Sequence, residues 1–154
     1  RLGSKIGVSN GIVWSSDSRF MYFIDSPTRQ IFKFNYEPVT GEIGNRQVVF
    51  EAPEGFGFPD GMAIDSDDHL WVAFWGCSCV AKMDPSDGSI HERVIVPVTA
   101  PTACAFGGSN MNQLLITTAS LGLDQEAKAN QPLAGDLFIA EVPAKGVPPF
   151  QYAG

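Results

Sequence analysis

The 154-residue chain carries a formal net charge of −7 at pH 7 with 44% hydrophobic and 18% charged residues, a composition typical of a globular domain with its own core. Its ten lysines and arginines stand mostly apart, which argues against binding to nucleic acid or to an anionic membrane surface. No apolar run approaches the roughly 20 residues of a membrane helix, and no signal peptide is recognisable, so we expect a cytoplasmic protein.

Short apolar runs rich in Val, Ile, Phe, Trp and Tyr follow one another along the chain, separated by glycine and proline. They predict strands at 11–14, 20–25, 30–36 and 47–50, then at 61–64, 70–75, 79–84 and 91–96, and finally at 103–106, 113–118 and 136–142. Glycine-containing turns at 38–41 and 85–88 join the third and fourth strands of the first two units. The polar loop at 121–136 is expected to hold one helical turn.

Each unit opens on a short motif at an equivalent position. Asn10-Gly11 opens the first unit, Asp60-Gly61 the second, and Thr102 takes the same place in the third. Four short strands between one entry position and the next are typical of a β-propeller blade. A β-sandwich is the main competitor, but its strands need not repeat in groups of four with a matched entry motif. We therefore predict an all-β fold, a β-propeller with about three blades at approximately 6–50, 58–97 and 101–143.

Asn10 and Asp60 are the candidate metal ligands. The first strand of every propeller blade lines the central channel, so equivalent positions on successive blades converge near the axis. An amide oxygen and a carboxylate are hard ligands, suited to calcium or another divalent cation. We interpret Gly11 and Gly61 as letting the backbone bend and leaving space above this site. The alternative is that both side chains bond only within their own turns, and spacing alone does not separate the two.

Other conspicuous residues receive structural interpretations. Cys77 and Cys79 could hold zinc, but neither histidine falls at a ligand spacing, and the two cysteines are too close in sequence for an easy disulfide. With Cys104, they are interpreted as unpaired buried thiols in a reducing compartment. Turn capping is assigned to Asp17, Asp25, Asp65, Asp67 and Asp84, and packing between blades to Trp14, Trp71, Phe74 and Trp75. Thr102 is expected to support the channel site rather than to bind the metal.

Several stretches resemble the senescence-marker-protein/gluconolactonase/luciferin-regenerating (regucalcin-like) family. They are SNGIVWSSDSRFMYFIDS, GEIGNRQVVF, PDGMAIDSDDHLWVAFW, KMDPSDGSI, ACAFGG and the terminal PPFQYAG. The resemblance implies a six-bladed propeller with one divalent metal in the channel, calcium or zinc, with magnesium and manganese as further candidates. It also implies that Asn10 is the asparagine ligand and that Asp60 is both a metal ligand and the general base.

The resemblance has two gaps. The family's glutamate ligand and its substrate-binding arginine and asparagine have no counterpart in this chain, and the family is about twice as long. We therefore expect residues 1–154 to be the C-terminal half of one propeller domain, completed by a missing N-terminal half or by another chain. The expected function is metal-dependent hydrolysis of a small lactone or ester. The alternative is a non-catalytic calcium-binding propeller.

Overall fold

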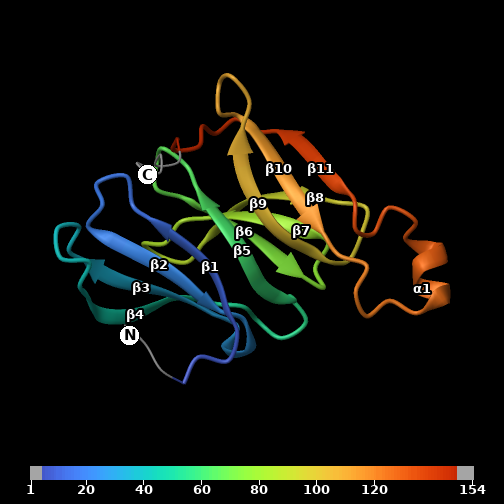
Figure 1. Cartoon of the computed structure of the whole chain (residues 1–154), viewed down its shortest axis with the longest axis horizontal. Helices are drawn as coiled ribbons and strands as arrows, with labels where there is room; N and C mark the ends of the chain where they lie inside the picture. Colours follow the sequence, from blue (N-terminus) through green and yellow to red (C-terminus); the bar gives the residue numbers. More distant parts are fainter. Residues whose placement is uncertain (1–4, 149–154) are drawn as a thin grey trace.

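The computed structural model describes residues 5–148, which form three antiparallel sheets with little helix (Figure 1). The first sheet comprises, in spatial order, β1 (Ser9–Trp14), β2 (Phe20–Asp25), β3 (Gln30–Tyr36) and β4 (Ile43–Glu51). The second comprises β5 (Phe58–Ile64), β6 (Leu70–Trp75), β7 (Cys79–Met83) and β8 (Ile90–Ile95). The third comprises β9 (Pro101–Gly107), β10 (Gln113–Thr118) and β11 (Leu137–Glu141).

The three sheets adjoin through β1, β5 and β9, which lie next to one another near the middle of the molecule (Figure 1). Antiparallel sheets whose first strands gather in this way are propeller blades, so the predicted all-β propeller fold is confirmed. A short 3-10 helix, η1 (Ser26–Thr28), follows β2, and the helical turn expected in the polar loop is α1 (Gln125–Asn130). Within residues 5–148, no helix has the length and apolar character needed to span a membrane. Of the terminal PPFQYAG stretch, only Pro148 falls among the described residues.

The second sheet is buried on both faces, which explains why β6 is apolar without a break. Successive side chains of a strand point to opposite faces. Leu70, Val72 and Phe74 accordingly join the core shared with the first sheet, while Trp71 and Ala73 join the core shared with the third. The packing roles predicted for Trp71 and Phe74 are therefore confirmed.

Aromatic contacts mark both cores. Trp71 meets Phe106 of β9 edge to face at 5.6 Å between ring centroids, and Phe74 meets Phe50 of β4 at 6.0 Å. Such pairs add to the stabilisation that burial alone provides. Trp14 also contacts Tyr36 within its own sheet, edge to face at 5.7 Å between ring centroids.

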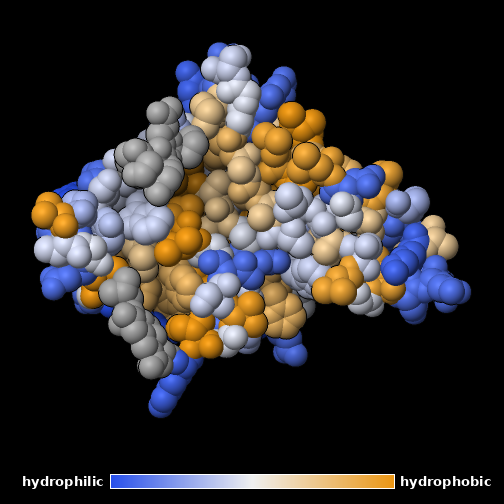
Figure 2. All heavy atoms as spheres, viewed as in Figure 1, coloured by the Kyte–Doolittle hydropathy of each residue, from blue (hydrophilic) through white to orange (hydrophobic). Residues whose placement is uncertain are grey.

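The outer edge of the third sheet is open among the described residues. β11 pairs only with β10, whereas the third strands of the other two sheets each have a fourth strand beside them. Figure 2 shows apolar atoms over β10 and β11, and Leu137 and Ile139 of β11 are 63% and 61% exposed. An unpaired strand that exposes apolar side chains invites pairing with another chain.

We therefore predict that this chain on its own self-associates or captures another half-propeller. Light scattering after size exclusion should report species larger than the 16.6 kDa monomer. Leu137→Lys with Ile139→Lys should shift the distribution toward monomer. Val39→Lys is the control, because Val39 lies in the turn between β3 and β4 and is 90% exposed. A stable, monodisperse monomer of the unmodified chain would contradict the prediction.

Candidate functional site

A β-bulge lies at the same place in each of the three innermost strands. In β1 it falls at Asn10-Gly11, in β5 at Asp60-Gly61 and in β9 at Thr102, each time with one extra residue relative to the partner strand. A bulge re-aims its side chains, and bulges are over-represented next to active sites. The three positions that the sequence treats as equivalent thus share one backbone irregularity.

Gly11 and Gly61 allow the innermost strands to approach each other closely. A Cβ added to Gly11 would lie 2.8 Å from the Asp60 carbonyl oxygen, and one added to Gly61 would lie 2.4 Å from the Ala103 Cβ. Neither glycine has a positive φ. The prediction that these glycines leave open space above the site is therefore wrong, because the neighbouring strand fills that space. What they provide is direct contact between β1 and β5, and between β5 and β9.

This contact brings the Asn10 and Asp60 side chains together. Both residues are half-buried. Burial raises the pKa of Asp60 above its usual value, and a hydrogen bond from the Asn10 side chain partly opposes that rise. Because a nearby positive charge favours an ionised carboxylate, a cation beside Asp60 would stabilise it. In the described part of the chain neither side chain bonds within its own turn, as the capping alternative would require.

Ser26, which sequence reasoning missed, links the Asn10 side chain to the backbone of the residue before Asp60. The Asn10 amide nitrogen donates to the Ser26 hydroxyl at 3.1 Å, and that hydroxyl donates to the Pro59 carbonyl at 2.6 Å. Because Ser26 engages the amide nitrogen, the Asn10 amide oxygen remains available to a cation. No sequence signal distinguishes this serine, since its partners lie 16 and 33 residues away.

We expect Ser26→Ala to lower divalent-cation affinity about 10-fold, a loss typical of removing a group that orients a metal ligand. Ser26→Thr, which keeps the hydroxyl, should retain most of the affinity. Thr28→Val is the matched control, because the Thr28 hydroxyl lies in the same 3-10 helix but donates to the Asp25 carbonyl at 2.8 Å. Titration calorimetry provides the measurement, and equal affinity for Ser26→Ala and the unmodified protein would refute the orienting role.

Thr102 does not join Asn10 and Asp60 by a side-chain bond. Its hydroxyl lies 2.6 Å from the Thr117 hydroxyl of its own sheet. The Thr102 carbonyl oxygen instead lies against Gly61, 2.9 Å from the place where a Cβ would stand. Thr102 therefore contributes to the spacing of β5 and β9, and its expected role in supporting the channel site stays a prediction.

A second cluster, formed by Asp65, Asp67 and His69, lies just past the end of β5. Potential ligand atoms of these three residues all lie within 4.8 Å of one another. The Asp65 carboxylate is already engaged, because it accepts the backbone N–H groups of Asp67 and His69 at 3.0 and 2.9 Å and the Trp71 indole N–H at 3.0 Å. The Lys82 ammonium lies 3.4 Å from the Asp65 carboxylate. Asp65 thus stabilises the β5–β6 turn, as predicted.

The charge state of Asp65 agrees with this structural role. Burial raises the pKa of Asp65, but the hydrogen bonds from Trp71, His69 and Asp67, together with the Lys82 ammonium, lower it by more. The net pKa is below the ordinary value, so the carboxylate is ionised at neutral pH. Because its oxygens already have donors, a cation would have to displace them.

The remaining aspartates follow the prediction with two exceptions. Asp17 and Asp84 accept backbone N–H groups of their own turns. Asp25 instead accepts backbone N–H groups of the segment that precedes β1 and makes no capping hydrogen bond to η1. In residues 5–148 the Asp67 carboxylate accepts no hydrogen bond, whereas Asp68 accepts from a backbone N–H in the β1–β2 turn of the neighbouring sheet at 2.7 Å. Sequence reasoning therefore assigned the cap to Asp67, although the neighbouring residue makes the contact.

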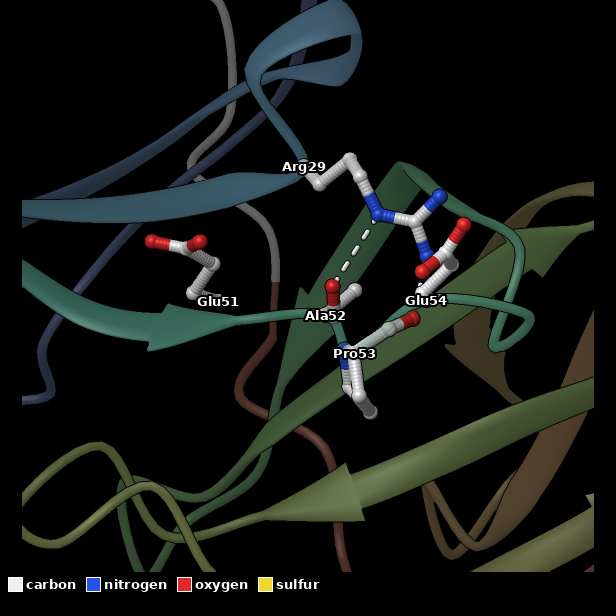
Figure 3. A pocket seen from close by; sticks show the side chains of 5 residues that line it. All are labelled: Arg29, Glu51, Ala52, Pro53 and Glu54. Atoms are coloured by element: carbon white, nitrogen blue, oxygen red, sulfur yellow. Dashed lines mark hydrogen bonds between the residues drawn. The ribbon is translucent and has the colours of Figure 1, made fainter.

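A groove of about 540 Å³ opens beside η1 and is lined by Arg29 and residues 51–54 (Figure 3). The Arg29 Nε donates to the Ala52 carbonyl at 3.0 Å, drawn as a dashed line in Figure 3, and the guanidinium also donates to the Pro53 carbonyl. Arg29 therefore holds the loop that leads into β5. Neither Asn10 nor Asp60 lines this groove, so it is separate from the candidate metal site.

All three cysteines are unpaired thiols. Cys79 and Cys104 are buried, as predicted, and burial raises the pKa of each to about 12. Cys77 departs from the prediction because it is partly exposed. Among the described residues, the only group of three potential His, Cys, Asp or Glu ligands is the Asp65 cluster. A zinc site built on the thiols therefore has no further ligands in this part of the chain.

The sequence of this chain matches a known protein family over most of its length. Residues 1–120 match the family model described as the SMP-30/Gluconolactonase/LRE-like region. The chain is 38% identical to regucalcin from Gallus gallus over 151 residues, which cover 97% of this chain and 50% of that protein. The chain thus spans about half the length of the curated relatives it matches.

Solved structures give the same result. A calcium-binding protein, regucalcin, from Agrobacterium tumefaciens superposes with a TM-score of 0.89 at 31% identity, covering 95% of this chain and 50% of that one. A gluconolactonase from Xanthomonas campestris superposes with a TM-score of 0.62 at 27% identity, covering 74% of this chain and 36% of that one. About half or less of each solved chain is therefore matched.

Proposed function

The chain belongs to the SMP-30/Gluconolactonase/LRE-like family, and on that premise we propose that it supplies a metal-binding part of a lactone hydrolase. The substrate class is a small lactone or a related ester. The observation that carries the proposal is the meeting of Asn10 and Asp60 on the bulges of two adjacent innermost strands. Likeness to the Xanthomonas gluconolactonase supports the reaction class.

The residues present fit part of a site for a hard divalent cation. Asn10 and Asp60 supply two oxygen donors, and the partly buried carboxylate has a raised pKa that a cation would counteract. Calcium takes six to eight oxygen ligands, so the remaining ones would come from water, substrate and the rest of the propeller. Calcium and zinc are the leading candidates, followed by magnesium and manganese.

Each residue of the site has a distinct task in lactone opening. A divalent cation bound there would polarise the lactone carbonyl and acidify a water molecule. Asp60 accepts the proton of the attacking water and returns it to the ring oxygen as the alcohol leaves. Asn10 contributes a neutral oxygen, which leaves the positive charge undiminished, and Ser26 holds the Asn10 amide in place.

We further propose that residues 1–154 form the C-terminal half of one propeller, completed by an N-terminal half or by another chain. The open edge of β11 and the two-donor site both support this arrangement. Two protein oxygens should bind a divalent cation weakly. Calorimetry should therefore show poor affinity for this chain and much tighter binding in the completed propeller, whereas equal affinity in both would place the site elsewhere.

The hydrolase proposal is tested by assaying glucono-δ-lactone opening in the completed propeller, before and after chelation. Activity should disappear with the chelator and return with added divalent cation. Turnover that survives complete removal of metal would contradict the proposal. Tight cation binding without turnover of any lactone or ester would instead identify the non-catalytic calcium-binding alternative.

A further inference from the structure

Two thiols meet in the turn that joins β6 to β7. Cys77 lies within the turn and Cys79 opens β7, and the Cys79 Sγ donates to the Cys77 Sγ across 3.6 Å. Cys77 is partly exposed, whereas Cys79 is buried. We propose that Cys77 and Cys79 form a site of reversible oxidation, at which a hydroperoxide converts the two thiols into an intramolecular disulfide.

The shape of the turn explains how cysteines separated by one residue come so close. Gly76 and Ser78 on either side of Cys77 both have positive φ, 87° and 55°, so the chain curls instead of running straight into β7. A disulfide has an S–S length of about 2.0 Å, so the sulfur atoms must close by roughly 1.6 Å. Cys77 sits outside the paired strands, where rotation of its side chain can supply most of this movement.

The reaction proceeds in two balanced steps. The Cys77 thiolate attacks one oxygen of the peroxide, the O–O bond breaks, and a sulfenic acid forms on Cys77 with release of water or alcohol. The Cys79 sulfur then attacks the Cys77 sulfur, the S–O bond breaks and a water molecule leaves. Two thiols lose two electrons and two protons, and the peroxide takes them up.

The two cysteines differ in a way that fixes their order of reaction. A peroxide reaches the partly exposed Cys77 before the buried Cys79. The Cys79 sulfur lies next to the Cys77 sulfur and can attack it once Cys77 is oxidised. Burial raises the pKa of Cys79 to about 12, although the Arg93 guanidinium works against that rise. The raised pKa keeps Cys79 protonated, which slows the second step.

The thiol pair also lies against the segment that enters β5. A Cβ on Gly57 would stand 2.4 Å from the Trp75 carbonyl oxygen and 3.2 Å from the Cys77 Cβ, and Gly57 directly precedes the strand that carries Asp60. Tightening the turn would press on this entry segment. We therefore infer that oxidation weakens cation binding at Asn10 and Asp60, a consequence that rests on the proposed function whereas the disulfide itself does not.

The test treats the folded protein with hydrogen peroxide, blocks free thiols with N-ethylmaleimide and measures intact mass and peptide masses. We expect a loss of about 2 Da, equal to two hydrogens, with a Cys77–Cys79 linkage and full reversal by dithiothreitol. Cys104 is the internal control for folding, because it is buried and should react only after denaturation. Cys79→Ser should stop at a sulfenic acid that dimedone traps, and Cys77→Ser should resist peroxide.

Any of three results would overturn the proposal. They are three free thiols after peroxide treatment, a linkage that includes Cys104, and oxidation of Cys77 to a sulfinic acid without a disulfide. The effect on the site is measured separately, by titrating the reduced and oxidised forms with calcium. Weaker binding in the oxidised form is the expected result. Unchanged binding would overturn the link to the site, while the mass measurement decides on the disulfide.

Discussion

Asp60→Asn is expected to lower lactone turnover about 10²–10⁴-fold in the completed propeller, the range for loss of a general base. Asparagine keeps the size and one oxygen of the side chain but removes the charge and the proton acceptor. The fold should survive, because the Asp60 carboxylate is half-buried and its one identified partner is the Asn10 side chain. Steady-state kinetics at saturating cation, with circular dichroism as a check on the fold, measure the effect.

Two further substitutions separate the roles of ligand and base. Asn10→Asp adds negative charge beside the cation, so affinity should rise while Lewis acidity and turnover fall. Asp67→Asn should leave turnover unchanged, because the Asp67 side chain is exposed at the far end of β5. If Asp67→Asn abolished turnover while Asp60→Asn kept it with cation still bound, the assignment of the two aspartates would be reversed.

Asp65→Asn should produce the largest loss of stability, about 3 kcal/mol, as expected when a buried hydrogen-bonded ionic group loses its charge. The Asp65 carboxylate accepts three hydrogen bonds and faces the Lys82 ammonium. An amide in its place turns a donor toward at least one of these donors. Urea unfolding measures the free energy of unfolding of each variant. For the control Asp67→Asn, this free energy should stay within about 0.5 kcal/mol of the value for the unmodified protein.

The stability difference between the unmodified protein and Asp65→Asn should depend on pH, which gives an independent check. Because the folded-state pKa of Asp65 is lower than its unfolded value, the charged form stabilises the fold above the unfolded pKa of about 3.9. That contribution is lost as pH falls through the lower, folded-state pKa. The stability gap between unmodified protein and Asp65→Asn should therefore be constant from about pH 5 to pH 7 and narrow below about pH 4. A gap that widened in acid would contradict the assignment.

Local sequence patterns were enough to predict the strands and the equivalence of Asn10, Asp60 and Thr102. Alternating apolar residues, glycine-containing turns and a repeated entry motif are all visible within a few residues. The continuous apolar run of β6 is explained only by the structure, because it requires sheets on both faces. Predicted starts of β1, β5 and β9 fell two or three residues late, since each strand continues through its bulge.

What the sequence could not reveal depends on contacts between distant segments. Gly11 and Gly61 look like turn glycines in isolation, and only the neighbouring strand shows that a side chain would collide there. Ser26 has no local mark, because its partners come from β1 and from the start of β5. The contact between Cys77 and Cys79 depends on two residues with positive φ, one of them the serine between the two cysteines.

A crystal structure of the completed propeller with bound calcium would test most directly the central claim that Asn10 and Asp60 bind the cation. We predict one ion bound by the Asn10 amide oxygen and the Asp60 carboxylate at about 2.3–2.6 Å, with the Ser26 hydroxyl still hydrogen-bonded to the Asn10 amide nitrogen. An ion bound by Asp65, Asp67 and His69 instead, with Asn10 and Asp60 making no metal contact, would contradict the claim.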